Sequence, residues 1–227
     1  MSLLMRNLSM RSLLMLALLT SRLALGQTCK PAPDVPLACP APASLQTFGT
    51  IRACDDPTLG MPRWAAAWYQ HSKTSIPRDF CVWRKTPGMP APALYSGTGY
   101  DKGHLIAFAD IACSAEAAAL TCQTGNIAPQ PPQDNQTTWA RFEGKLRDWA
   151  DKADHGAPVL FVAGPSFTAP PLWVRSGLRR PSGFWKVALT SKGACGYAAL
   201  FGSPQVRPVA PSTLGFQQPL RSDCLAP

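Results

Sequence analysis

The chain has 227 residues, a formal net charge of +9 and 46% hydrophobic residues, so it can bury one core of ordinary size. Its 24 prolines exclude a helical bundle and favour many short elements joined by ordered turns. We find no internal repeat, which excludes a solenoid. These properties favour a single α+β domain.

The first 26 residues have the features of a secretory signal peptide. Arg6 and Arg11 precede a short apolar run at 13–19, and the small residues Ala24 and Gly26 follow it. The run is too short to cross a membrane, although an uncleaved N-terminal anchor is the alternative. We therefore expect cleavage near Gly26, a single domain over 27–227, and export to the periplasm or the extracellular space. Removing three arginines lowers the net charge from +9 to +6, so the mature chain stays basic.

Residues 29–54 show no catalytic pattern. The run 47–52 is the strand-like part of a proline-rich stretch. Trp64 and Trp68, with Tyr69, follow Pro62 with the spacing of a short helix. The run 80–83 has the apolar composition of a buried strand. We expect the segment after Pro62 and the run 80–83 to contribute to the core and not to a site.

A glycine-rich turn at 96–103 leads to His104 and then to the apolar run 105–108, which predicts a strand. Ser114 can cap an alanine-rich helical turn that ends near Cys122. Residues 125–129 form a second short extended segment, closed by Pro129. The pattern is strand, excursion, strand.

The periodicity changes from about Asp134 onward, where a helix is predicted. Its apolar side chains are Trp139, Phe142, Leu146 and Trp149, at intervals of three, four and three residues. Asn135, Glu143 and Arg147 lie along the edge of this stripe, at near multiples of a helical turn. If the helix packs against the His104 strand, then His104, Asn135 and Glu143 converge on one cleft.

Three further apolar runs, at 159–163, 184–189 and 197–201, predict central strands. A mixed or antiparallel sheet with helices packed on it follows. This completes the α+β prediction.

Eight cysteines lie beyond the expected cleavage site, and an even number in an exported chain favours disulfides. Structural zinc is disfavoured because no Cys-x-x-Cys pair occurs. We pair Cys113 with Cys122, closing the excursion after His104, and Cys195 with Cys224, fixing the C-terminus. The other four cysteines can pair in three ways.

These motifs resemble the sugar-non-specific DNA/RNA endonucleases, whose core is the ββα-metal (His-Me finger) unit. The similar segments are Gly99 to His104, Asn126 to Gln130, and the set Asn135, Trp139 and Glu143. The resemblance covers about 95–189, and the N-terminal third matches poorly. It implies a ββα-metal nuclease core on a central, mostly antiparallel sheet flanked by helices, here stabilised by disulfides.

The resemblance also implies the chemistry. His104 deprotonates a water that attacks phosphorus in line, because an imidazole titrates near working pH; the alternative is a buried structural histidine. Asn135 is the one direct ligand of Mg²⁺ or Mn²⁺, although capping the helix is its alternative role. Glu143 holds metal-bound waters, one of which protonates the leaving 3′ oxygen. Products then carry a 5′ phosphate.

Four further residues complete the predicted site. Asn126 orients catalytic groups or substrate, or else is a turn residue. Arg147 contacts a phosphate or pairs with Glu143. Arg141 and Gln130, together with Lys102 and Arg147, are expected to contact the substrate, with salt-sensitive backbone binding to DNA or RNA that reads no sequence.

Lys102 is the one departure within the signature, because the family usually has arginine there. Lysine keeps the positive charge and loses the planar fork that can hold a phosphate bidentately. We therefore expect Lys102 to reduce the activity of the enzyme without abolishing it. A further family arginine lies upstream, and Arg78 and Arg84 are the candidates for it.

Two other functions compete with the endonuclease prediction. One is an exported basic nucleic-acid-binding protein of the same fold with weak or no turnover; intact His104, Asn135 and Glu143 disfavour it. The other is a phosphodiesterase for small nucleotides, which a deep closed pocket would favour. The residues do not indicate an inhibitor partner or an oligomeric state.

Overall fold

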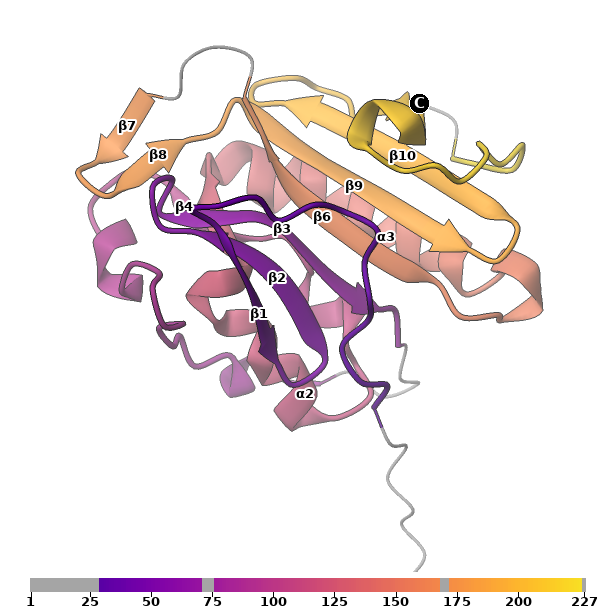
Figure 1. Ribbon diagram of the computed structural model, residues 1–227, viewed down its shortest axis with the longest axis horizontal. Coiled ribbons are helices and arrows are strands. Elements are labelled where there is room, and N and C mark those ends of the chain that lie inside the picture. The colour runs from indigo at the N-terminus through magenta and orange to yellow at the C-terminus, as the bar shows by residue number, and fades with distance from the viewer. Residues whose placement is uncertain (1–28, 71–75, 168–171, 226–227) are drawn as a thin grey trace, which may run out of the picture.

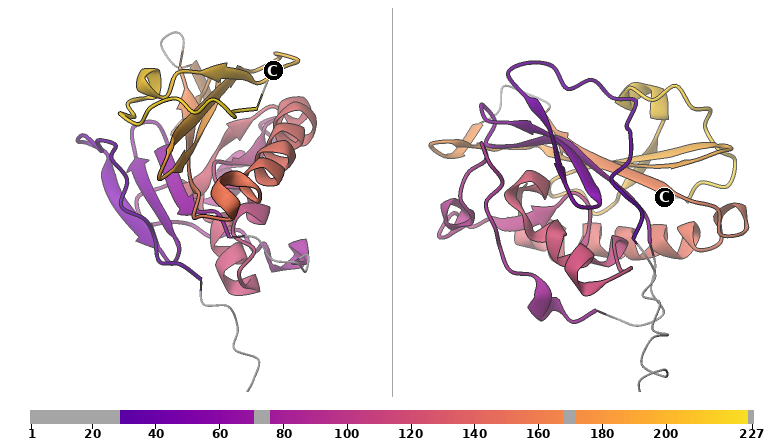
Figure 2. Two further views of the ribbon diagram at one scale, coloured as in Figure 1. Left: turned by 90° about the vertical axis from the view of Figure 1, so that its right-hand side faces the viewer. Right: turned by 60° about the horizontal axis from the view of Figure 1, so that its bottom comes forward.

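The computed structural model describes residues 29–70, 76–167 and 172–225. The expected signal peptide lies outside these ranges. A seven-stranded sheet runs through the molecule, with α3 along one of its faces (Figures 1 and 2). The second face is covered by N-terminal and C-terminal segments, through side chains such as Leu37 and Phe216.

Every named strand pair in the sheet is antiparallel, which confirms the α+β prediction with a mostly antiparallel sheet. The sheet order is β1-β2-β3-β6-β9-β10-β11. The strands are β1 (Ser44–Phe48), β2 (Ile51–Asp56), β3 (Met61–Trp68), β6 (Leu160–Ser166), β9 (Gly183–Thr190), β10 (Gly193–Leu200) and β11 (Arg207–Val209). The three apolar runs predicted as central strands lie in, or largely in, β6, β9 and β10.

The predicted helix after Pro62 is wrong, because Met61–Trp68 forms the central strand β3. Trp64 and Ala66 pack on one face of the sheet, while Ala65 and Ala67 pack on the other. A strand buried on both faces is apolar throughout, so it lacks the alternation that separates strand from helix.

The predicted buried strand at 80–83 is also wrong. This stretch begins in the 3₁₀ turn η1 (Arg78–Phe80) and continues without regular structure. Phe80 and Val82 are about half exposed, while Cys81 is tied to Cys122. The run is therefore held by the Cys81–Cys122 bridge and not by burial within the sheet.

A two-stranded unit, β4 (Asp101–His104) and β5 (Ile127–Gln130), carries the histidine segment. His104 is the last residue of β4, and the predicted strand at 105–108 instead leads into the 3₁₀ turn η3 (Phe108–Asp110). The backbone leaves the strand because the Asn126 side chain accepts a hydrogen bond from the N–H of Ile106 and donates one to its carbonyl oxygen. The excursion holds α2 (Ala115–Ala119), capped by Ser114 as predicted, and the 3₁₀ turns η4 (Leu120–Cys122) and η5 (Thr124–Asn126).

The predicted amphipathic helix is confirmed, with an irregular first turn. It begins as the π-helical segment η6 (Asp134–Trp139) and continues as α3 (Ala140–Ala150). All four side chains of the stripe are buried, and Trp139, Phe142 and Tyr197 form a chain of ring contacts. A π-helical turn displaces side chains from a regular helical spacing, and it falls here on Asn135.

The remaining elements are short. A hairpin of β7 (Leu172–Arg175) and β8 (Leu178–Arg180) projects from one end of the sheet (Figure 1). The other 3₁₀ turns are η2 (Pro92–Tyr95), η7 (Ala153–His155) and η8 (Pro211–Leu214). In the ranges described, no helix has both the length and the apolar character to cross a membrane.

Four disulfides form, and one predicted pairing is wrong. Cys195–Cys224 is confirmed, while Cys122 pairs with Cys81 and Cys113 pairs with Cys29. The fourth bridge joins Cys39 to Cys54. Cys113 does not pair with Cys122 because the chain beside it is held close to the N-terminal segment. Ile111 forms a β-bridge with Gln70, and the Gln70 side chain accepts a hydrogen bond from the backbone N–H of Lys30.

Candidate active site

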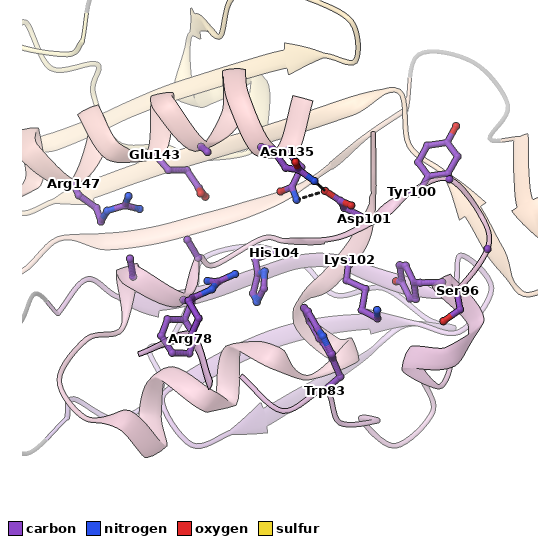
Figure 3. A pocket seen from close by; sticks show the side chains of 18 residues that line it. Arg78, Trp83, Ser96, Tyr100, Asp101, Lys102, His104, Asn135, Glu143 and Arg147 are labelled. Atoms are coloured by element: carbon purple, nitrogen blue, oxygen red, sulfur yellow. Dashed lines mark hydrogen bonds between the residues drawn. The ribbon is translucent and has the colours of Figure 1, made fainter. Parts of the chain in front are cut away.

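A pocket of about 640 Å³ lies between β4 and the helix formed by η6 and α3 (Figure 3). It brings together His104, Lys102, Asn135, Glu143 and Arg147, five of the residues predicted from the sequence. Its other polar lining residues include Arg78, Ser96, Tyr100, Asp101 and Gln136. The predicted convergence of strand and helix on one cleft is therefore present in the structure.

Close packing fixes the position of His104. A Cβ on the preceding Gly103 would lie 2.6 Å from both Cβ and Oε1 of Gln130, so only glycine fits there. Asn126 is fully buried, and its side chain bonds the backbone of Ile106 and the carbonyl of Thr121. Asn126 thus holds the chain just beyond His104 and does not face the pocket.

The His104 ring lies between an aromatic side chain and a disulfide. Its centroid is 5.3 Å from that of Trp83, and its Nε2 is 3.5 Å from Sγ of Cys122. Nε2 is therefore turned to the disulfide, and Nδ1 forms no hydrogen bond with any of the described residues. Burial, and then the charge of Arg78, lower the pKa of His104 from 6.5 to about 3, which keeps the ring neutral and able to accept a proton.

Asn135 is oriented by a carboxylate. Its Nδ2 donates to Oδ2 of Asp101 at 2.8 Å, and Gln136 donates to the same oxygen. Because the amide nitrogen is held in this way, the carbonyl oxygen of Asn135 is the atom available to a cation. A neutral oxygen of this kind fits a hard divalent ion that keeps most of its water.

A buried lysine joins Glu143 to Asp110, and the sequence patterns did not indicate it. Lys186 of β9 is fully buried, and its Nζ donates to Oδ2 of Asp110 at 2.6 Å and to Oε1 of Glu143 at 2.8 Å. Burial alone would lower the pKa of Lys186, but the two carboxylates raise the pKa above its ordinary value. Burial raises the pKa of Glu143, with Asp110 adding to the effect and Lys186 opposing it. The only sequence signal for this buried lysine is its place within the apolar run 184–189, which predicts a central strand.

Three cationic side chains line the pocket. Arg147 Nη1 lies 3.2 Å from Oδ1 of Asp110, so it pairs with this acid and not with Glu143. Lys102 places its Nζ 5.0 Å from the Trp83 ring centroid. Of the two candidates for the upstream arginine, Arg78 lines the pocket and Arg84 does not.

Two predicted substrate contacts lie elsewhere. Gln130 is buried, and its side chain packs closely against Gly103 of β4. Arg141 lines a separate cavity of about 270 Å³ on the other side of the helix. Arg141 and Arg147 are six residues apart, which turns them to different sides of the helix.

One cluster of potential metal ligands stands out among the described residues. The ligand atoms of Cys81, His104 and Cys122 lie within 4.8 Å of one another. The two sulfurs form a disulfide, and metal binding needs thiolates. The oxygens that the resemblance implies for a cation, those of Asn135 and Glu143, line the pocket separately from this cluster.

A neutral histidine that faces an amide oxygen and a carboxylate across a cation-lined pocket is the arrangement of a phosphodiester hydrolase. The family model described as DNA/RNA non-specific endonuclease matches residues 38–211. The chain belongs to this family of nucleases, as its resemblance implied.

Known proteins with similar sequences are nucleases. The chain is 33% identical to a nuclease of Nostoc sp. over 99 residues, which are 43% of this chain and 34% of that protein. It is 31% identical to a Serratia marcescens nuclease over 118 residues, 46% of this chain and 43% of the relative. Human mitochondrial endonuclease G is 43% identical over 73 residues, 32% of this chain and 24% of the relative. The matched regions thus span less than half of each relative.

A solved structure of EndoG in complex with EndoGI has a similar fold. The TM-score is 0.63 at 17% identity, over 75% of this chain and 81% of that chain. This likeness concerns the fold.

Proposed function

We propose that the protein is an exported, metal-dependent endonuclease that cleaves DNA and RNA without sequence preference and leaves 5′-phosphate ends. The observation that carries the proposal is the opposition of His104 on β4 to Asn135 and Glu143 on the helix, across one pocket. Binding without turnover would need the cationic side chains of the pocket but not this set of three residues.

His104 is the general base. Its Nδ1 takes the proton of the attacking water, because Nε2 is turned to the sulfur of Cys122. The depressed pKa of His104 keeps the base form available at neutral pH. Burial limits the basicity of the ring, so the protein must also stabilise the negative charge that develops on phosphate.

Asn135 and Glu143 are the residues that would hold Mg²⁺ or Mn²⁺, the carbonyl oxygen of Asn135 directly and Glu143 through water. A divalent cation bound there would neutralise charge on the phosphate and on the leaving oxygen. Asp101 holds the amide nitrogen of Asn135, which leaves its carbonyl oxygen free for a cation, and Lys186 keeps Glu143 in one orientation. We assign no part of the reaction to Gln130 or Arg141.

Arg78, Lys102 and Arg147 supply positive charge for the scissile phosphate. Arg78 and Lys102 make no ion pair within the described residues, so both are available to a substrate. Their contacts would be with backbone phosphates, which accounts for cleavage without sequence preference. Lysine in place of the usual family arginine offers one charged point in place of a fork.

The four disulfides and the signal-peptide pattern support export, since such bridges persist in oxidising compartments. A mature chain from about residue 27 then acts in the periplasm or outside the cell.

The test uses the purified mature protein with plasmid DNA and with RNA, each with Mg²⁺ and with EDTA. We expect cleavage of both polymers with Mg²⁺ and none with EDTA, and no cleavage by His104→Ala. The 5′ ends are checked by ligating the products without prior phosphorylation. Binding of both polymers without any cleavage would overturn the proposal and favour the non-catalytic alternative.

A further inference from the structure

The β7–β8 hairpin carries three arginines and two exposed apolar side chains. Leu172 is 65% exposed and Trp173 is 51% exposed, both high values for side chains of this size. The sequence of the hairpin contains no aspartate or glutamate. A basic projection with an exposed indole combines the two groups that bind nucleic acid, a cation for phosphates and a flat ring for bases.

The hairpin borders the active-site pocket. The Arg180 guanidinium lies 6.0 Å from the ring centroid of Tyr100, which is a pocket-lining residue. Arg175 Nη1 lies 3.5 Å from the carbonyl oxygen of Leu94, just before the pocket-lining stretch from Tyr95 to Gly97. Figure 3 shows Arg78, His104 and Lys102 on one side of the pocket and Tyr100 at its end, and Tyr100 is the residue that Arg180 of the hairpin approaches.

The exposed ring of Trp173 is held in place. Trp173 and Arg179 are opposite one another in the hairpin register, and the Arg179 guanidinium lies 3.7 Å from the indole centroid. A stacked cation restrains the ring on one side and leaves about half of the side chain exposed. The ring is therefore already ordered for a planar partner, which reduces the entropy lost on binding.

Among the described residues, no carboxylate neutralises the charge of Arg175 or of Arg180. Neither side chain forms an ion pair with any described residue, whereas Arg147 within the pocket is paired with Asp110. A polyanion is the partner that fits these two arginines on a projection without carboxylates.

We propose that the β7–β8 hairpin is a second nucleic-acid contact, which extends the substrate track beyond the scissile phosphate. Arg175 and Arg180 bind backbone phosphates, and Trp173 stacks on an unpaired base. The inference rests on the proposed nuclease function. It makes the hairpin a determinant of substrate length and of how tightly a single strand binds relative to a duplex.

Binding is tested on a His104→Ala background with Mg²⁺, so that no substrate is consumed. Fluorescent single strands of about 20 nucleotides and of about 4 nucleotides are compared across a salt series, since a binding unit of this kind covers roughly 4 to 16 nucleotides. Arg175→Ala with Arg180→Ala should weaken binding of the long strand by about tenfold or more and lower the slope of log K against log salt by about 1.4, for two phosphates. Binding of the short strand should not change.

Trp173→Ala should weaken binding of the long single strand about fivefold or more, and of a duplex of the same length much less. Arg207→Ala is the matched control, because Arg207 is an exposed arginine on β11 at the far edge of the sheet, and it should bind like the parent. Unchanged long-strand affinity and slope in the double arginine variant would overturn the inference, as would an equal loss for the short strand. Binding is measured without turnover. An inactive wild-type protein would therefore refute the nuclease proposal, while the binding data would still test the role of the hairpin.

Discussion

The pocket has two walls that are built on different principles. The β4 wall carries Arg78, Trp83, Lys102 and His104, and its cations rest on aromatic rings without an ion pair among the described residues. The α3 wall carries Asn135, Glu143 and Arg147, and its charges are paired through Asp110 and the buried Lys186. The first wall keeps its charge available to a phosphate, while the second uses its charges to hold one geometry. Substitutions in the β4 wall should therefore lower activity with little loss of stability, and substitutions behind the α3 wall should lower stability.

The largest effect on activity is expected from His104→Ala. Loss of an essential base should lower kcat by at least about a thousandfold, while the free energy of unfolding stays within about 1 kcal/mol of wild type. Single-turnover cleavage of plasmid DNA and urea unfolding measure the two quantities. A rate near that of wild type would remove His104 as the base.

Lys186→Met should have the largest effect on stability. Removing one member of a buried charge group leaves Asp110 and Glu143 uncompensated, at a cost of about 3 to 5 kcal/mol. Because the pKa of Lys186 is raised in the folded state, its contribution is present below the ordinary pKa of 10.5 and is lost as the pH rises through the raised value. Urea unfolding at pH 7 should show the full loss.

Lys145→Met is the matched control for Lys186→Met, since Lys145 is an exposed lysine on α3. It should change the free energy of unfolding by less than about 0.5 kcal/mol. If both lysine variants unfold alike, the buried group does not hold the α3 wall.

The two walls also differ in how far the sequence predicts them. His104, Asn135 and Glu143 follow from local patterns, a glycine-framed histidine and the edge of a helical stripe, strengthened by the family signature. Lys186 lies 76 residues from Asp110 and 43 from Glu143, and their contact depends on β9 packing beneath the helix. No local periodicity encodes such a contact.

The same limit explains the disulfide error. Cys113 and Cys122 are near in sequence, and their true partners, Cys29 and Cys81, come from segments without regular structure. The β3 error has a different cause, because a strand covered on both faces has the composition of a buried helix.

Lys102 tests whether charge or shape matters on the β4 wall. If it contacts the scissile phosphate, Lys102→Ala should lose about 2 to 4 kcal/mol of transition-state stabilisation, and Lys102→Arg should keep or raise kcat. A residue that only lines the groove would instead raise KM and flatten the salt dependence. Measuring kcat and KM at two salt concentrations separates these results, and an unchanged kcat in Lys102→Ala would refute the catalytic role.

The Cys81–Cys122 bridge should matter more to catalysis than the Cys39–Cys54 bridge, because Cys122 contacts His104. Replacing either pair with alanines should lower stability by about 2 to 5 kcal/mol. Only the loss of Cys81–Cys122 should also lower kcat, by about tenfold, through a less well placed imidazole. Equal kcat values for the two double variants at a temperature where both are folded would show that the sulfur contact does not position His104.

The smallest effect is a shift in pH dependence on the β4 wall. The neutral form of His104 is the base, and burial together with Arg78 lowers the pKa of His104 from 6.5 to about 3, so kcat/KM should not fall as the pH drops through 6.5. Arg78→Gln removes a repelling charge, which raises the pKa of His104 and moves the acid limb of kcat/KM to higher pH, whatever its effect on the maximal rate.

Arg84→Gln is the matched control for Arg78→Gln, because Arg84 is an exposed arginine six residues further along that does not line the pocket. It should leave the acid limb in place. The sign of the shift in Arg78→Gln is the decisive result: a limb that stays in place or moves to lower pH would show that the Arg78 charge does not act on His104. The β4 wall would then bind phosphate through Arg78 without that charge adjusting the base.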